Sequence, residues 1–238
     1  MTELASPGTA ALQADRRRLV LVWQDPVTRR FVRVGHLDEF ASGRYTFSYD
    51  AGASTASFDP LAEFPSIDGT YVSDRLPAFF GNRVMDRGRG GYAEYRGWLG
   101  LEVETDTPFE VLVRTGGGRA TDTFHVVDDL RVEGDAVTTR FFVSGIRHVQ
   151  RAADEVAALR AGATLTLRRD PHNQHNPLAV LLDAAPDRPI GFVPDWLVEE
   201  VCELIDSGRL VDVVAERVNS LARPHLRVLC RLSAQRGR

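Results

Sequence analysis

A polar, proline-punctuated loop at residues 170–177 interrupts a series of strand-like runs in the second half of the chain. The runs lie at residues 140–144, 163–169, 178–183 and 189–193, and each combines β-branched and aliphatic residues between Gly, Pro, Asp or Asn. This pattern predicts β-strands. Because the Asp, Asn and His side chains of the loop can bond to nearby backbone groups, we expect the loop to keep a fixed shape. A rigid loop on a sheet is a common position for a binding function.

The length and composition of the chain indicate an ordinary globular protein. It has 238 residues, enough for one large or two small domains, with 43% hydrophobic and 26% charged residues. No apolar run reaches the ~20 residues that span a bilayer, and the N-terminus lacks the pattern of a signal peptide. Cys202 and Cys230 are too few for a disulfide framework. We therefore expect a cytoplasmic protein with reduced thiols and no membrane partner.

The charge of the chain argues against a general attraction to nucleic acid. The formal net charge is −4, so a high-affinity, non-specific DNA binder is not expected, although a local basic groove remains compatible with this value. All 29 basic residues are Arg, whose forked donors suit phosphate groups. Arg16, Arg17 and Arg18 precede the first predicted strand, and we interpret them as a solvated flank rather than as an arm that contacts phosphate.

Two classes of chemistry have little support in the sequence. His172 and His175, taken with Cys202, Cys230 or His225, suggest zinc, but the cysteines lie far apart at apolar positions and lack the close spacing of zinc ligands. No Ser-His-Asp set, carboxylate pair or nucleotide-binding motif stands out. We therefore predict that the protein is not an enzyme and holds no metal or cofactor.

The sequence predicts an α+β fold with two modules. Residues 1–15 are small, polar and without pattern, which is typical of a disordered tail. Residues 16–139 form a small mixed β/α module and residues 140–233 form a second module, with the boundary near residue 139. The first module is expected to hold strands at residues 19–24, 30–36 and 43–50 and helices at 71–86, capped by Ser73, and at 92–101.

In the second module, further elements follow from the hydrophobic periodicity. A helix over residues 149–159 is expected to end before Gly162, which would provide its C-cap. A second helix over residues 196–207 is expected to begin at Asp195, which would cap it. Two strands at residues 210–218 and 226–232 complete the module.

The second module resembles a HIRAN domain. Gly145-Ile146-Arg147, Arg169-Asp170-Pro171-His172-Asn173 and Ile190-Gly191-Phe192-Val193-Pro194 carry the resemblance, in order and at matching spacing. HIRAN domains are OB-like β-barrels with added helices. They occur alone in bacteria and fused to SNF2-type helicases, and a DNA-binding member grips the 3′-hydroxyl end of single-stranded DNA. The resemblance therefore implies an OB-like barrel that binds nucleic acid, with a bacterial origin and a role in DNA repair.

The resemblance also places candidate binding residues. Arg147 and His148 match the Arg-Tyr pair of the first motif, and Phe192 matches the aromatic position of the last one. His175, Asn176 and Leu178 depart from the Tyr, Asp and Asn of the family pattern. An Asn at 176 can still accept a bond from the 3′-hydroxyl, without the strength of a charged acceptor. The candidate nucleic-acid-binding residues are Arg147, His148, Arg168, Asp170, Asn173, His175, Asn176 and Phe192.

Structural roles compete with the binding roles in this set. Asp170, Asn173 and Asn176 are equally suited to hydrogen bonds within the loop. Arg168 is interpreted as a phosphate contact, whereas strand alternation places Arg169 on the other face.

The first module resembles the small N-terminal region of HipA-type toxin kinases. The runs RYTFSYD, beginning at Arg44, and LPAFFGNRVM, beginning at Leu76, carry this resemblance, and the sequence departs from the family pattern after Asn82. The chain passes into the HIRAN-like module where a kinase lobe would follow, so no phosphotransferase activity is implied. This resemblance implies a docking module with a possible protein partner.

Two functions remain open from the sequence. The first is a nucleic-acid-binding protein that holds single-stranded DNA or its 3′ end through the HIRAN-like module. The alternative is a protein-interaction or regulatory adaptor without DNA binding. Convergence of Arg147 and Arg168 with His148 and Phe192 on one groove favours the first function, and scattered arginines favour the second.

Overall fold

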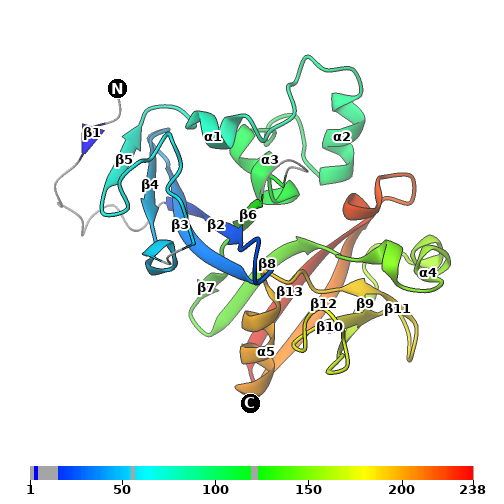
Figure 1. Cartoon of the computed structure of the whole chain (residues 1–238). Coiled ribbons are helices and arrows are strands. Elements are labelled where there is room, and N and C mark those ends of the chain that lie inside the picture. The colour runs from blue at the N-terminus through cyan, green and yellow to red at the C-terminus, as the bar shows by residue number, and fades with distance from the viewer. Residues whose placement is uncertain (1–2, 5–15, 55–56, 119–122, 238) are drawn as a thin grey trace. The chain divides into compact units, whose positions relative to one another are not determined.

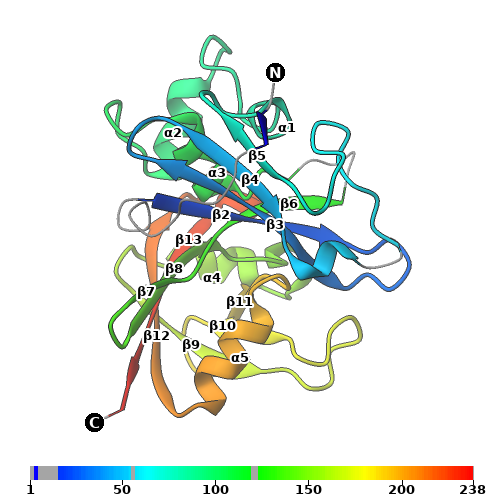
Figure 2. The ribbon, with the colours of Figure 1, turned by 90° about the vertical axis from the view of Figure 1, so that its left-hand side faces the viewer.

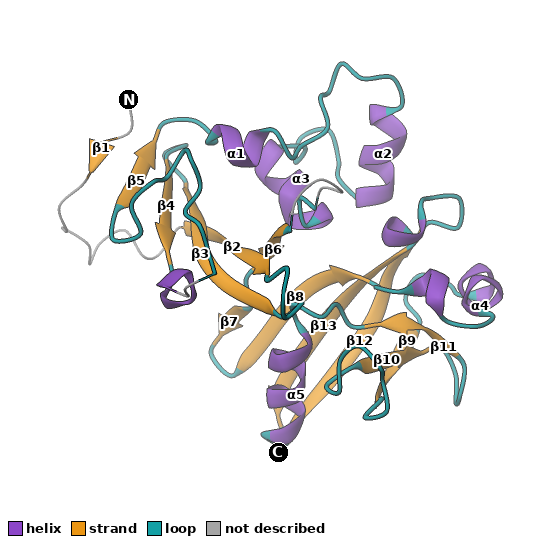
Figure 3. Ribbon diagram, viewed as in Figure 1, coloured by secondary structure: helices purple, strands orange, loops and turns teal. Residues whose placement is uncertain are grey.

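The computed structural model describes residues 3–4, 16–54, 57–118 and 123–237. These residues form mostly antiparallel strands with short helices, which confirms a mixed α+β fold (Figure 1; Figure 3). The chain divides into two compact units, residues 1–92 with 101–129 and residues 93–100 with 130–238. The predicted disordered tail at residues 1–15 lies outside the described residues, apart from the short strand β1 (Glu3–Leu4).

The first unit is built on a six-stranded antiparallel sheet in the order β1-β5-β4-β3-β2-β6. Its core face is aromatic: the ring of Phe47 stacks on Phe64 at 4.3 Å between centroids and also contacts Phe80. Helix α3 (Pro108–Thr115) places Phe109 and Leu112 in the same core. The remaining elements are β2 (Arg16–Gln24), β3 (Phe31–Phe40), β4 (Tyr45–Tyr49), η2 (Ala51–Ser54), β5 (Thr70–Ser73), α1 (Ala78–Gly81) and β6 (Phe124–Asp128).

The prediction of a long helix at residues 71–86 was wrong. Residues 70–73 form β5, which pairs with β4, and only Ala78–Gly81 is helical. Pro77 has extended backbone angles and begins the short helix, because proline fits the start of a helix better than its interior. The amides of Ala78 and Phe79 donate to the carboxylate of Glu63, so Ser73 is not the cap.

The second unit is built on a seven-stranded sheet in the order β11-β10-β9-β12-β13-β8-β7. Helix α5 lies across one face of it (Figure 2). The strands are β7 (Arg131–Glu133), β8 (Ala136–Phe142), β9 (Thr164–Arg169), β10 (Val180–Asp183), β11 (Pro189–Phe192), β12 (Arg209–Val218) and β13 (Val228–Arg236). The helices are α2 (Tyr92–Leu99), whose residues from Ala93 on belong to this unit, η3 (Ile146–His148), α4 (Ala152–Ala158), α5 (Val198–Asp206) and η4 (Pro224–Leu226).

The strand ladders do not close this sheet into a barrel, so the predicted OB-like barrel is not confirmed. The edge strand β11 nevertheless meets the chain just beyond β8 at an isolated bridge between Phe192 and Ser144. Their backbone amides and carbonyls exchange two hydrogen bonds of 2.9 and 2.8 Å. Residue 139, near the predicted domain boundary, lies inside β8.

The predicted cap of the last helix was also wrong. Helix α5 begins after Leu197, and no side chain caps it. The carboxylate of Asp195 instead accepts a hydrogen bond of 3.0 Å from Nδ2 of Asn176, in the polar loop. None of the helices in the described ranges is long and apolar enough to cross a membrane.

Candidate nucleic-acid interface

The short helix η3 presents Arg147 and His148 to solvent. Gly145 begins the turn with a left-handed φ of 67°, and the buried side chain of Ile146 anchors it. Nε of Arg147 donates to Nε2 of His148 at 2.9 Å, which requires a neutral imidazole with that nitrogen unprotonated. Among the residues that the structure describes, no carboxylate pairs with Arg147. Its guanidinium charge is therefore available to an anionic ligand.

Phe192 lies directly beside this helix. The bridge to Ser144 fixes its backbone, and its half-buried ring lies over Gly145, where a Cβ would come within 3.0 Å of Cδ2 of Phe192. The structure therefore brings Arg147, His148 and Phe192 together, although Phe192 is more than 40 residues away in sequence. A cation, an imidazole and an aromatic ring in one place are the groups that hold a phosphate and stack on bases.

Arg168 lies on the same sheet face as Phe192, but its guanidinium is paired with a carboxylate. Leu181 pairs with both Arg168 and Phe192, so the three side chains form a row across β9, β10 and β11. The guanidinium of Arg168 donates twice to the buried carboxylate of Asp183, at 2.6 and 2.9 Å. These bonds raise the pKa of Arg168 above its usual value. Arg169 points to the opposite face and donates to Asp206 of α5.

Asn173 is the centre of the polar loop at residues 170–177. Its Nδ2 donates to Asp170 at 3.1 Å, and its Oδ1 accepts from the amides of His175 and Asn176 at 3.0 and 3.2 Å. Oδ1 of Asn176 accepts from the amide of Leu178. The polar atoms of these side chains thus hold the shape of the loop, whereas the ring of His175 is exposed.

The loop is bonded to the segment that follows β11 through Asp195. Asn176 donates to Asp195, which is three residues after Phe192 in the chain. Asp195 is exposed. The loop is therefore bonded to a carboxylate from a position that the motif comparison did not single out.

The loop between β12 and β13 contributes residues that the sequence reasoning missed. Its helix η4 is adjacent to η3, and it exposes Leu221, Arg223 and His225 to solvent. Partial desolvation of the ring by its surroundings and, to a smaller extent, the charge of Arg223 lower the pKa of His225. No carboxylate within the described part of the chain pairs with Arg223. Nothing in the sequence pattern predicts that residue 223 lies near residue 147, because the two are joined only by the fold.

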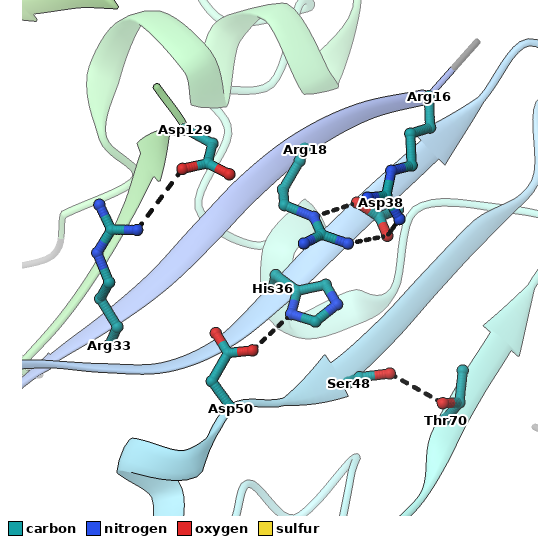
Figure 4. A network of polar contacts seen from close by, with 9 residues as sticks. All are labelled: Arg16, Arg18, Arg33, His36, Asp38, Ser48, Asp50, Thr70 and Asp129. Carbon is teal, nitrogen blue, oxygen red and sulfur yellow. Dashed lines mark hydrogen bonds and ion pairs between the residues drawn. The ribbon is translucent and has the colours of Figure 1, made fainter. Parts of the chain in front are cut away.

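A second polar network lies on the sheet of the first unit (Figure 4). Arg18 donates to the buried Asp38 at 2.7 and 2.8 Å, and Arg33 pairs with Asp129 at 3.6 Å. The interpretation of Arg16, Arg17 and Arg18 as a solvated flank was therefore wrong, because all three lie in β2. Arg16 and Arg18 contact Asp38, and Arg17 pairs with Glu110 at 2.6 Å. Since carboxylates balance most of these cations, this face offers little attraction to a polyanion.

The same network contains His36, Asp50 and Ser48, the residue types of a hydrolase triad. Nδ1 of His36 lies 2.8 Å from Oδ1 of Asp50, and Ser48 is directly opposite His36 on the neighbouring strand (Figure 4). The hydroxyl of Ser48, however, is hydrogen-bonded to Thr70 at 2.9 Å. The contacts of the described residues therefore do not place Ser48 under the control of His36, as a nucleophile requires.

The cysteines and histidines do not gather around a common point. No group of three or more metal-ligating side chains occurs in the ranges that the structure describes. Cys202 and Cys230 are both buried and free, and burial raises the pKa of each thiol.

Comparison with known proteins identifies the second unit. The HIRAN domain family model matches residues 135–236, so this part of the chain is a HIRAN domain. A crystal structure of a protein from Lactobacillus plantarum is 18% identical over 43% of this chain and 97% of its own, with a TM-score of 0.37. The crystal structure of the HIRAN domain of human HLTF is 14% identical over 44% of this chain and 84% of its own, with a TM-score of 0.35.

The comparisons leave the first unit without a family. No curated protein matches the sequence of the chain. The resemblance of the N-terminal region to HipA-type kinases has no support from these comparisons.

Proposed function

We propose that the HIRAN domain of this protein binds single-stranded DNA at or near its 3′ end. The observation that carries the proposal is the cluster of the exposed Arg147 and His148 with the half-buried Phe192, in which Arg147 has no carboxylate partner among the described residues. In this proposal Arg147 holds the last phosphodiester, because guanidinium groups bind phosphate oxygens bidentately. His148, His175 and Phe192 stack on the splayed bases.

Asp195 provides the acceptor for the 3′-hydroxyl in this proposal. The two oxygens of a carboxylate accept several hydrogen bonds, and the bond from Asn176 uses only one of them. Asn176 is less suited to the role, because one lone pair of its Oδ1 accepts from the amide of Leu178 and the amide carries no charge to strengthen a bond from a hydroxyl. A charged acceptor that tolerates a hydroxyl and repels a phosphate would favour free 3′ ends.

A fluorescence-anisotropy titration tests the proposal. Two short single strands that differ only in a 3′-hydroxyl or a 3′-phosphate are compared at low and moderate salt. We expect tighter binding to the free hydroxyl, a loss of affinity of about tenfold in Arg147→Ala, and a loss of the preference in Asp195→Asn. Arg236→Ala is the matched control, because Arg236 is 74% exposed and lies at the far end of β13. Equal affinity of wild type and Arg147→Ala would contradict the proposal.

The adaptor function is the second candidate, and the ion pair between Arg168 and Asp183 favours it. That pair removes one of the two arginines expected in a phosphate-binding groove. In this reading the first unit docks a protein partner and the HIRAN domain is a scaffold. The titration separates the two functions, since an adaptor binds neither strand even at low salt.

A further inference from the structure

A segment outside the HIRAN domain is attached to it. Residues Ala93–Gly100 precede the matched range 135–236 by more than 30 residues but belong to the same compact unit. Nδ2 of Asn219 donates to the carbonyl of Trp98 at 2.8 Å, and Nη1 of Arg217 donates to the carbonyl of Gly97 at 3.2 Å. These bonds go to carbonyls in the last turn of helix α2, where the intrahelical partners run out. Leu99 is completely buried.

The loop between β12 and β13 connects this segment to the proposed DNA site. Asn219 also donates to the carbonyl of Leu226, in η4, at 2.9 Å. The helix η4 is in turn adjacent to η3, which carries Arg147. One side chain, Asn219, therefore fixes both the end of α2 and the loop that borders the candidate site. Leu221, which is 90% exposed, lies at the tip of this loop.

Several arginines of the second unit are neutralised by carboxylates, but those of this region are not. Arg140, Arg168, Arg169 and Arg188 each form an ion pair with a carboxylate. Within the described ranges, Arg96, Arg217 and Arg223 have no such pair. Arg151, Arg160 and Arg209 of the same unit also lack such a pair within the described ranges. Around η3, the end of β12, the β12–β13 loop and α2, however, four arginines carry charge that no carboxylate balances: Arg96, Arg147, Arg217 and Arg223.

An apolar and an aromatic side chain accompany these arginines. Trp98 is half-buried in α2, as is Arg96. Leu221 is exposed and lies between Arg217 and Arg223 in the sequence. Interleaved cations and flat or apolar side chains are typical of surfaces that follow a single strand, because phosphates and unstacked bases alternate along it.

We propose that Ala93–Gly100 and the β12–β13 loop extend the DNA site, so that a single strand held at η3 continues over them. Arg96, Arg217 and Arg223 contact successive phosphates, and Trp98 and Leu221 contact bases. The inference rests on the proposed function, and it makes the preferred ligand a strand longer than the few nucleotides that fit around Arg147. The N-terminal part of the chain thereby supplies part of the binding surface of the HIRAN domain.

The test compares strand lengths on the full chain. Wild-type protein is titrated with single strands of about 4 and about 12 nucleotides with free 3′-hydroxyls, a range that matches single binding folds. We expect the longer strand to bind at least fivefold more tightly. In the double variant Arg96→Gln with Arg223→Gln this gain is lost while the affinity for the short strand is unchanged. The log–log salt slope for the long strand becomes shallower by about 0.7 for each lost contact.

The control is Arg236→Gln with Arg209→Gln, which removes the same charge at the other end of strands β12 and β13. This control variant is expected to bind the longer strand more tightly than the shorter one, as the wild type does. Equal binding of both lengths by the wild type would overturn the extended site while leaving the 3′-end site intact. An unchanged gain in Arg96→Gln with Arg223→Gln, or the same loss on both strand lengths, would also overturn it. Failure of the wild type to bind either strand would overturn both proposals.

Discussion

Gly191 shows how one residue allows the candidate site to form. A Cβ at this position would lie 2.4 Å from Cγ1 of Val143 and 2.5 Å from the carbonyl oxygen of Ser144. Its φ of 153° is also one that residues with a side chain rarely adopt. Only glycine therefore lets β11 come close enough to bridge Ser144, and that bridge holds Phe192 beside η3. The close approach at Gly191 thus explains why the motif has a glycine immediately before Phe192.

The first prediction concerns this close approach. Gly191→Ala is expected to lower the free energy of unfolding by about 3 kcal/mol, because the added methyl group overpacks the contact and the backbone is strained. Urea denaturation followed by tryptophan fluorescence measures the change. Gly97→Ala is the control, since nothing lies within 4 Å of a Cβ there and the residue is helical. Equal stability of Gly191→Ala and wild type would contradict the close approach.

The second prediction separates two arginines of the candidate set. Arg168→Ala leaves the buried carboxylate of Asp183 without its bidentate partner, so it is expected to cost about 2 kcal/mol of stability. Its effect on DNA affinity is expected to be less than twofold once folded protein is titrated. Arg147→Ala is expected to show the reverse, with weaker binding and unchanged stability, because Arg147 is exposed. Denaturation and anisotropy measured on both variants distinguish the roles, and a larger binding loss in Arg168→Ala would reverse the assignment.

At the scale of elements, the sequence pattern predicted correctly those strands that are specified by residues adjacent in the chain. The strands β9, β10, β11 and β12 lie within or close to their predicted ranges, because runs of β-branched residues between turn residues specify them locally. The helix expected at residues 71–86 failed because Tyr71 and Val72 have partners in β4, and helical spacing alone does not reveal such pairing. The strand β7 is three exposed residues and carries no periodic signal.

The third prediction concerns the polar loop as an element. Asn173→Ala removes the acceptor of two amides and the donor to Asp170, so it is expected to cost about 1–2 kcal/mol. The amides of His175 and Asn176 should also exchange hydrogen faster, which hydrogen–deuterium exchange measures. His172→Ala is the control, because the side chain of His172 is exposed. Unchanged exchange at these two amides would show that Asn173 does not hold the loop.

For the whole molecule, the motifs predicted the family of the second half of the chain but not which distant residues surround the candidate site. The motif positions Arg147 and Phe192 lie together as the resemblance implies, whereas Arg223 and the segment Ala93–Gly100 join them through contacts between distant parts of the chain. The net charge also does not predict where the cationic side chains are available, because it does not show which arginines are neutralised by carboxylates. Only the ion pairs of the folded chain show which arginines are neutralised by carboxylates and which remain free to bind an anion.

The fourth prediction follows from the two hydrophobic cores of the molecule. One core lies within residues 19–126 and the other within residues 137–234, and they have no residue in common. Because each core supports its own sheet, scanning calorimetry is expected to resolve two unfolding transitions rather than one. Gly191→Ala should lower the midpoint of one transition by several degrees and leave the other unchanged. DNA should raise the midpoint of that same transition, because ligand binding stabilises the unit that holds the site. A single transition that moves as a whole in Gly191→Ala would show instead that the two units unfold cooperatively.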